Sequence, residues 1–381
     1  MNYIDAQYLD LLKDIIENGV RKNTRAGEVL SVFGRSMRFN LRDGLPLLTT
    51  KKVFTKGIIH ELIWFLKGDT NIKYLIDNNV NIWTDDAYRY YTELVTKHNK
   101  VVAHELSRDF YKIQPIDVVS KEEFIKRVGL QQKELFILNE KNYIMSFIPN
   151  SYAMDYTYGD LGAVYGKQWR GGNAKSENKF TFSQIDQIQM IIDKLKNNPD
   201  DRRILCDAYS PMDIYSDYGV ALPPCHMFFQ FWTREMKVDE RAEWYFEHSD
   251  EDIIRLADVD EKWLDERNVP KRALSCMYYM RSNDYMCGQP YNTPSYAILT
   301  YIIANICNMV PDELIFNGGD VHVYANHLEG AKEQLSRNGS DVIPQFHIKR
   351  QLTSIDDLKY EDFEITDYYP DAPIKFQLNV G

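Results

Sequence analysis

Residues 222–233 read LPPCHMFFQFWT, and the fold of the surrounding chain can be worked out from this stretch. The apolar and aromatic run His226–Thr233 predicts a buried strand. Pro223 and Pro224 fix the backbone just before that strand, so they restrain the direction in which the Cys225 thiol points. Because a thiolate is the nucleophile in cysteine chemistry, Cys225 is a candidate catalytic residue. A buried, inert cysteine is the ordinary alternative.

The expected partner of this strand is Ala273–Arg281. Between the two strands lies a polar stretch, 234–272, that carries no chemical motif and suggests an extended hairpin. A second polar stretch, 84–158, is rich in charge and tyrosine. Neither stretch is flanked by a Pro/Gly linker, and the chain shows no internal repeat. We therefore expect one domain over residues 1–381, with insertions at about 84–158 and 234–272.

The rest of the chain alternates between helical and strand-like spacing of apolar residues, which indicates an α+β fold. Thr293-Pro294 resembles an N-cap followed by proline at the first helical position. Helices are predicted at 3–17, 57–66, 185–195, 293–308 and 324–336, strands at 29–41, 203–209 and 314–323, and a glycine-rich loop at 159–170.

Charge and cysteine usage exclude several classes of protein. With 56 acidic and 45 basic residues the net charge is −11, so no global positive field favours nucleic acid, and we expect a small ligand. The five cysteines show no CxxC spacing, which argues against a disulfide framework or a zinc site and favours a reducing compartment. No leader-like segment or long apolar run is present, so we expect a cytoplasmic protein without a membrane span.

Several arginines could hold an anion. Planar guanidinium groups with a nearby hydroxyl suit a phosphate dianion, although each alone could equally form a surface ion pair. The candidates are Arg25, Arg202, Arg203, Arg281 and Ser282. Arg202 and Arg203 are adjacent and cannot both point to one face of a strand, so we expect them to serve different partners.

Four further residues are candidates for the site. His322 and Tyr324 alternate in GDVHVY, so they share one strand face and could hold a sugar hydroxyl or form a core pair. Asn292 lies just before the predicted helix at 293, where a turn or capping role would be ordinary. Glu61 stands out because it lies within the apolar helix GIIHELIWFL, residues 57–66.

Taken together, these segments resemble the thymidylate synthase family from Gln7 to about Lys375, apart from the two polar stretches. The segments that carry the resemblance are SVFGRSMRFNL, PLLTTKK, IIHELIWFLKGDTNI, NIW, GDLGAVYGKQWR, DDRRIL, LPPCH, FFQF, YNTPSY and GDVHVYANH. The resemblance implies a single domain with a large mixed sheet packed against helices. It also implies a homodimer.

The resemblance assigns roles to the candidate residues. Cys225 would add to C6 of a uracil ring in dUMP. The phosphate would be held by Arg25, Arg281 and Ser282, with Arg202 and Arg203 reaching in from the other subunit. His322 and Tyr324 would bind the 3′-hydroxyl.

Asn292 would read the base, because a carboxamide can donate to uracil O4 while it accepts from N3–H, whereas cytosine offers the reverse pattern. Glu61 would organise proton transfers near O4 through water, which requires a carboxyl with a pKa perturbed by burial. Tyr165 would lie near the C5 proton.

The second substrate implied is 5,10-methylenetetrahydrofolate, with no metal. Its pterin would meet Asp284. Its ring system would lie along Ile82, Trp83, Leu222, Gly288 and Tyr291. Hydride transfer to the resulting exocyclic methylene would give dTMP and dihydrofolate, whereas water would give 5-hydroxymethyl-dUMP and tetrahydrofolate.

The sequence departs from the family pattern mainly on the folate side. The loop around Arg25 is shortened, no second tryptophan follows Trp83, Cys287 and Tyr291 replace family leucine and phenylalanine, and the tail 376–381 is unusual. A wetter pocket favours hydroxymethylation, as in enzymes that some viruses use to make modified DNA. We expect methylation, because Trp83 would shield the intermediate. Hydroxymethylation is the alternative, and an inert nucleotide- or RNA-binding relative is a third hypothesis.

Overall fold

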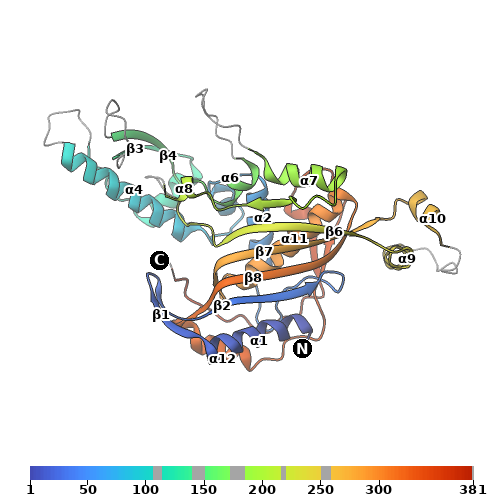
Figure 1. Ribbon diagram of the computed structural model, residues 1–381. Helices are drawn as coiled ribbons and strands as arrows, with labels where there is room; N and C mark the ends of the chain where they lie inside the picture. The colour runs from blue at the N-terminus through green and yellow to red at the C-terminus, as the bar shows by residue number, and fades with distance from the viewer. Residues whose placement is uncertain (106–113, 140–150, 172–184, 216–219, 250–258, 380–381) are drawn as a thin grey trace.

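The computed structural model describes residues 1–105, 114–139, 151–171, 185–215, 220–249 and 259–379. Its centre is a six-stranded mixed sheet in the order β1-β2-β8-β7-β6-β5, with helices against one face (Figure 1). The strands are β1 (Val20–Thr24), β2 (Gly27–Asn40), β5 (Leu205–Asp207), β6 (His226–Glu235), β7 (Arg272–Asp284) and β8 (Val310–Tyr324). The expected α+β class with a large mixed sheet is confirmed.

The helices around this sheet include the five that were predicted and three short ones, at 73–77, 165–170 and 211–214, that were not. They are α1 (Tyr3–Asn18), α2 (Thr55–Leu66), α3 (Lys73–Asp77), α6 (Tyr165–Arg170), α7 (Gln187–Asn197), α8 (Pro211–Ile214), α11 (Gln289–Cys307) and α12 (Leu328–Leu335). A separate hairpin near the C-terminus pairs β9 (Gln345–Ile348) with β10 (Phe363–Thr366). Within the described residues, no helix is both long and apolar enough to cross a membrane.

The sheet has one covered face and one open face. Its neighbouring strands are antiparallel except β7 and β8, which run parallel and are joined by α11. A parallel pair needs such a crossover, and α11 packs on the covered face. On the other face Phe33 is 76% exposed, Trp232 59% and Tyr279 37%. These aromatic side chains lie without cover in a single chain.

The first insertion is a folded unit rather than a solvated loop. It consists of α4 (Thr84–Glu105), α5 (Lys121–Gly129) and the hairpin β3 (Lys133–Asn139) with β4 (Ser151–Thr157). Its many aromatic residues form a buried cluster continuous with the main core: Tyr91, Phe124, Phe136, Tyr156 and Tyr158. Burial of several aromatic rings explains how so polar a stretch holds together.

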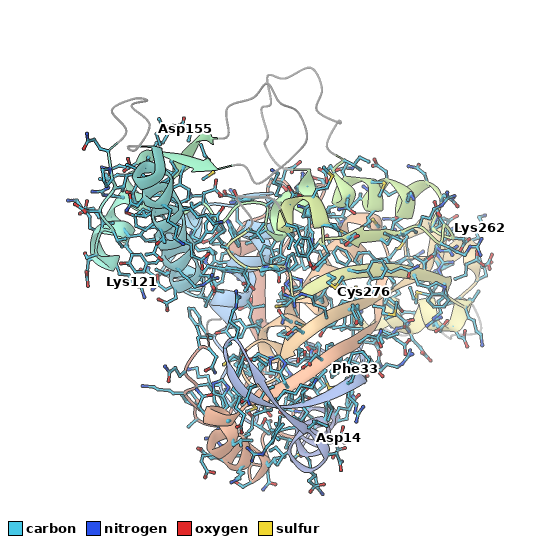
Figure 2. All side chains as sticks on the ribbon, turned by 60° about the vertical axis from the view of Figure 1, so that its left-hand side comes forward. Asp14, Phe33, Lys121, Asp155, Lys262 and Cys276 are labelled. Atoms are coloured by element: carbon cyan, nitrogen blue, oxygen red, sulfur yellow. The ribbon has the colours of Figure 1, made fainter. Side chains whose placement is uncertain are left out.

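The second insertion lies at the opposite end of the molecule, as the positions of Lys121, Asp155 and Lys262 show (Figure 2). Strands β6 and β7 flank it and pair antiparallel, as expected for an extended hairpin. The connection contains the helices α9 (Val238–Glu247) and α10 (Glu261–Glu266). These helices bury a small separate cluster of Ala242, Val259, Leu264 and Val269.

One helix begins earlier than predicted. Helix α11 starts at Gln289, with Pro290 in its first turn, so Thr293 is not its N-cap and Pro294 lies inside the helix. Asn292 already belongs to this first turn, since its backbone N–H donates to the Gly288 carbonyl at 2.9 Å. Pro290 and Pro294 each lie in a local sequence that fits the start of a helix. Pro294 has no backbone N–H, so the helix loses one hydrogen bond near its start.

Other boundaries also differ from the prediction, three of them as follows. The expected loop 159–170 carries the short helix α6 from Tyr165 onward. The strand expected at 203–209 pairs only over Leu205–Asp207. The helix expected at 324–336 begins as a 3₁₀ turn, Ala325–His327, before α12.

A buried carboxylate anchors the N-terminal helix. Asp5 is 0% exposed. It accepts bonds from the hydroxyl and backbone N–H groups of Thr49 and Thr50 at 2.6–3.2 Å, and from the Asn2 amide at 3.0 Å. The bonds to Thr49 and Thr50 join α1 to the loop that leads into Lys51.

Replacing this carboxylate is expected to destabilise the protein. Asp5→Ala leaves several buried donors without an acceptor, so the free energy of unfolding should fall by about 3 kcal/mol in denaturant titrations. Asp10→Ala is the control, because Asp10 is exposed on the same helix. A loss for Asp5→Ala no larger than that of the control would show that this anchor is unimportant.

Candidate active site

One cavity of about 840 Å³ brings most of the predicted site residues together. It is walled by the ends of β7 and β8, the turn between β1 and β2, parts of α2, α4 and α11, and the C-terminal tail. The predicted residues that line it are Arg25, Glu61, Ile82, Trp83, Leu222, Cys225, Arg281, Ser282, Asp284, Gly288, Tyr291, Asn292, His322 and Tyr324. Tyr165, Arg202 and Arg203 do not line it.

Cys225 ends a loop that Arg281 holds against strand β7. The Arg281 Nε donates to the Pro224 carbonyl at 2.8 Å and Nη2 donates to the Pro223 carbonyl at 2.9 Å. Nη2 also lies 4.0 Å from the Cys225 Sγ. Burial raises the pKa of the Cys225 thiol, and the Arg281 charge opposes that shift. The thiol is therefore mostly protonated at neutral pH.

Tyr165 and His226 lie behind the nucleophile. The Cys225 backbone N–H donates to the Tyr165 hydroxyl at 2.8 Å, and the Tyr165 ring stacks on His226 at 3.9 Å. His226 shares a 2.7 Å hydrogen bond with Tyr296, and burial lowers the pKa of His226 to about 3. His226 is thus neutral at physiological pH and is a weak base. Tyr165 reaches the cysteine backbone rather than the cavity surface.

Burial shifts the pKa of Glu61 toward neutrality. Glu61 projects from α2 into the cavity wall, and its Oε1 accepts a 2.7 Å hydrogen bond from the Trp83 indole. Desolvation raises the pKa of Glu61 to about 7, with the Trp83 bond acting in the other direction. The carboxyl can therefore both donate and accept a proton near neutral pH. The same bond fixes Trp83 in the wall.

Asn292 and Asp284 face the cavity from the start of α11 and the end of β7. The Asn292 Nδ2 lies 3.5 Å from the Met280 sulfur, a weak acceptor, which leaves its polar atoms available to a ligand. Asp284 uses Oδ1 to accept from the backbone N–H groups of Met286 and Cys287, both at 3.0 Å. A side chain at Gly288 would lie 3.1 Å from the Asp284 carbonyl oxygen, so glycine keeps this corner open.

His322 is oriented by a neighbour that sequence reasoning left unassigned. Its Nδ1 shares a 3.0 Å hydrogen bond with Asp320, which also accepts from Ser31 and Lys22. These bonds, led by the one from His322, lower the pKa of Asp320. Asp320, His322 and Tyr324 alternate on β8, so period-two spacing was the signal that could have identified Asp320. The carboxylate fixes the imidazole, whose other nitrogen can face a ligand.

The predicted arginines fall into two groups. Arg25 lies in the turn between β1 and β2 and borders the cavity together with Arg281. Arg202 and Arg203 are exposed and lie outside the cavity of their own chain. The Arg202 carbonyl accepts from Gln230 on β6, so this segment runs along the edge of the sheet.

Sequence reasoning left Lys51 unassigned and noted the tail 376–381 only as an unusual segment on the folate side. Buried Lys51 donates to the Met286 carbonyl at 2.6 Å, and its ammonium lies 4.8 Å from the Phe376 ring centre. Burial lowers the pKa of Lys51 to about 8. Phe376 and Leu378 line the cavity, and the Gln377 carbonyl is 2.7 Å from His327 Nε2. The tail therefore forms part of the cavity wall.

Among the described residues, one group has the composition of a metal site. Ligand atoms of Asp284, Cys287 and His327 lie within 4.8 Å of one another. Two of these residues already serve the fold, because Asp284 caps a turn and His327 holds the tail. The nearby Lys51 cation also competes with a metal for the same carboxylate. We assign no metal to this group.

Comparison with known proteins gives a consistent result. A family profile described as thymidylate synthase matches residues 6–380. Proteins named thymidylate synthase are similar over nearly the full length: one from Mycoplasma mobile is 37% identical over 98% of this chain and 99% of its own. One from Saccharomyces cerevisiae is 36% identical over 100% and 98%, and one from Homo sapiens 35% over 99% and 91%.

The raised pKa of Glu61 predicts a specific pH dependence of stability. Between the ordinary value of 4.5 and about 7, the folded protein binds the Glu61 proton and the unfolded chain does not. Stability contributed by this group is therefore present below pH 4.5 and is lost as the pH rises through 7. Glu61→Gln cannot titrate, so it should gain stability relative to wild type as the pH rises across this window. Chemical denaturation at several pH values measures the difference, and a difference independent of pH would contradict the prediction.

Proposed function

This chain belongs to the thymidylate synthase family, whose members are one-carbon transferases acting on dUMP, and we propose that it converts dUMP to dTMP with 5,10-methylenetetrahydrofolate. The observation that carries the proposal is the convergence of Cys225, Arg281 and Asn292 on one cavity. A nucleophile, an anion-binding group and a base-reading amide are the three elements that this chemistry needs.

The proposed nucleotide site follows from the free hydrogen-bonding groups. Arg281 spends Nε and Nη2 on the cysteine loop, and among the described contacts its Nη1 has no partner and can donate to phosphate. Ser282 and Arg25 add donors from the same chain. His322 and Tyr324 hold the 3′-hydroxyl, and the Asn292 amide pairs with O4 and N3–H of the uracil.

In the proposed reaction the Cys225 thiol gives its proton to water, and the thiolate adds to C6 of the ring. The electron pair of the C5–C6 double bond then becomes available at C5, which bonds to the methylene carbon of the folate as one of the two C–N bonds of that carbon breaks. Arg281 supports the thiolate, and Glu61, with a pKa near 7, relays protons at O4 through water. Water in the cavity takes the C5 proton, and we propose that the Tyr165 hydroxyl, which lies behind Cys225, assists from the protein side. The remaining C–N bond to the folate then breaks, which releases tetrahydrofolate and leaves the exocyclic methylene. The tetrahydrofolate, still bound, gives a hydride to the methylene and becomes dihydrofolate, and Cys225 leaves C6 to give dTMP.

The proposed folate site occupies the other end of the cavity. Its apolar wall is made by Ile82, Trp83, Leu222 and Tyr291, with Gly288 leaving space for the rings. Asp284 has one carboxylate oxygen left to accept from the pterin. Lys51 and Lys52 line the same cavity and can attract the glutamate carboxylate of the folate.

Hydroxymethylation is the second candidate product. It is favoured by the carboxyls of Asp85 and Asp86, which line the cavity and hold water well. Hydride transfer is favoured by the Trp83 indole, which the Glu61 bond keeps in the wall. We propose methylation on that ground.

The five cysteines are free, which supports the expected cytoplasmic location.

The homodimer is part of the proposal. The open sheet face carries Phe33, Trp232 and Tyr279, and exposed aromatic groups on a flat sheet suit burial against a second copy. Arg202 and Arg203 do not line the cavity of their own chain, which is compatible with our proposal that they serve the cavity of a partner. A phosphate site shared between subunits would make dimerisation necessary for activity.

Mass spectrometry of the nucleotide product tests the reaction. With dUMP and 5,10-methylenetetrahydrofolate we expect dTMP together with dihydrofolate. Cys225→Ala should form no product, while Cys307→Ala should retain activity because Cys307 lies at the end of α11, outside the cavity. Only 5-hydroxymethyl-dUMP would establish the alternative product. No turnover, with no covalent adduct to 5-fluoro-dUMP and the folate, would indicate an inert binder.

Complementation tests the shared site. The double variant Arg202→Ala/Arg203→Ala and the variant Cys225→Ala should each be nearly inactive alone. Co-expressed, half of the dimers are mixed, and each mixed dimer has one intact site, so about a quarter of wild-type activity should return. If the arginines act within their own chain, one cavity of each mixed dimer lacks its arginines and the other lacks the cysteine, so no activity should return. Absence of complementation would therefore contradict the shared site, and the reciprocal arrangement gives an independent check.

Mixed dimers with all three substitutions on one chain separate the two geometries. If the arginines serve the partner's cavity, each cavity of such a dimer lacks either the cysteine or the arginines, and activity should be absent. If they serve their own chain, the unsubstituted subunit remains intact and about half of the wild-type activity per dimer persists. Affinity tags of different kinds allow the mixed dimers to be isolated.

A further inference from the structure

The loop that ends in Cys225 depends on donors from outside itself. Pro223 and Pro224 have no N–H groups, so they contribute carbonyl acceptors without donors. Arg281 satisfies the carbonyls of Pro223 and Pro224, and its backbone N–H satisfies the Cys225 carbonyl at 2.9 Å. At the other end of the loop, the Ala221 N–H donates to the Leu161 carbonyl at 2.9 Å. The Ala221 carbonyl is a further acceptor of this loop, and none of these groups donates to it.

Its donor comes from the first insertion. Arg89, in the second turn of α4, donates from Nη2 to the Ala221 carbonyl, 132 residues away in the chain. The Arg89 side chain is 23% exposed and is held by two carboxylates of its own helix. Asp86 pairs with Nη2 at 3.1 Å and Glu93 pairs with Nη1 at 2.8 Å. The guanidinium is thus fixed on both sides before it reaches the loop.

We propose that Arg89 is a positioning residue that couples the first insertion to catalysis by clamping the loop of the nucleophile at Ala221. Arg281 holds the C-terminal half of this loop, and Arg89 holds its N-terminal half. The inference deepens the proposed function, since the loop matters catalytically only if Cys225 is the nucleophile. It gives the insertion a role that its sequence did not suggest.

A guanidinium is suited to this role for geometric reasons. Arg89 makes three contacts in different directions, to Ala221, Asp86 and Glu93, which a planar group with several donors can satisfy together. A lysine ammonium at the same place would be a single point and could not span all three. Loss of the guanidinium would leave the Ala221 carbonyl, in a partly buried contact, without its donor.

Arg127 provides a matched control within the same insertion. Its Nε donates to Glu123 at 2.9 Å and its Nη1 donates to the Tyr158 hydroxyl at 2.7 Å. Like Arg89 it is a largely buried guanidinium paired with a carboxylate of its own helix, at 26% exposure. Its described contacts all lie inside the insertion. A general effect of weakening the insertion should therefore follow from substitution of either arginine.

The experiment compares Arg89→Met with Arg127→Met. Hydrogen exchange of the ligand-free proteins, read in peptides that cover residues 220–228, should become about tenfold faster in Arg89→Met and change little in Arg127→Met. The kcat of Arg89→Met should fall by about tenfold, while its KM for dUMP changes little because Arg89 does not border the nucleotide site. Arg89→Lys should lie between wild type and Arg89→Met. If a methionine variant does not fold, Arg89→Lys is compared with Arg127→Lys instead.

The outcomes separate this inference from the proposed function. Unchanged exchange in the loop of Arg89→Met, or an equal effect of Arg127→Met, would overturn the positioning role. Faster loop exchange with an unchanged kcat would also overturn the coupling to catalysis. If wild type does not convert dUMP, the proposed function fails, whereas the exchange measurement still decides whether Arg89 clamps the loop.

Discussion

The structure of the site depends on the two hydrogen bonds from Arg281 to the carbonyls of Pro223 and Pro224. A loop with consecutive prolines cannot supply its own donors, and buried carbonyls without partners are costly. Arg281 meets this need from β7 and places its charge 4.0 Å from the Cys225 sulfur. One side chain thus fixes the loop, opposes the rise in thiol pKa caused by burial, and still offers Nη1 to an anion. The Arg281 side chain therefore fixes the position of the nucleophile relative to the anion site.

Burial changes the pKa values of the ionisable groups of the site in different ways, depending on the hydrogen-bond partners of each group. His226 has only a hydroxyl partner, and burial lowers its pKa to about 3, so it stays neutral. Asp320 has three donors and keeps its charge, with a lowered pKa. Glu61 has a single indole donor, which offsets the effect of burial only in part, so burial raises its pKa to about 7. Of these three groups, only Glu61 can exchange a proton readily at neutral pH.

Short-range patterns in the sequence predicted the main strands, the restrained cysteine and the shared face of His322 and Tyr324. They were less reliable where local rules permit two answers, as with Pro290 and Pro294, either of which fits a helix start. The chemical roles came from resemblance over ten segments rather than from spacing. Contacts between distant segments left no pattern at all: the bond from Arg89 to Ala221 spans 132 positions and depends on how the insertion folds.

The same contact bears on how the cavity treats water. Asp86 lies near the proposed folate wall, and a free carboxylate there would retain water close to the methylene that hydride must reach. Its Oδ1, however, is engaged by Arg89, and Trp83, three residues earlier, is held in the wall by Glu61. The Asp86 carboxylate and the Trp83 indole are thereby partly satisfied by protein rather than by solvent. These two contacts leave less of the wall free to bind water than its composition suggests, in keeping with the proposed hydride transfer.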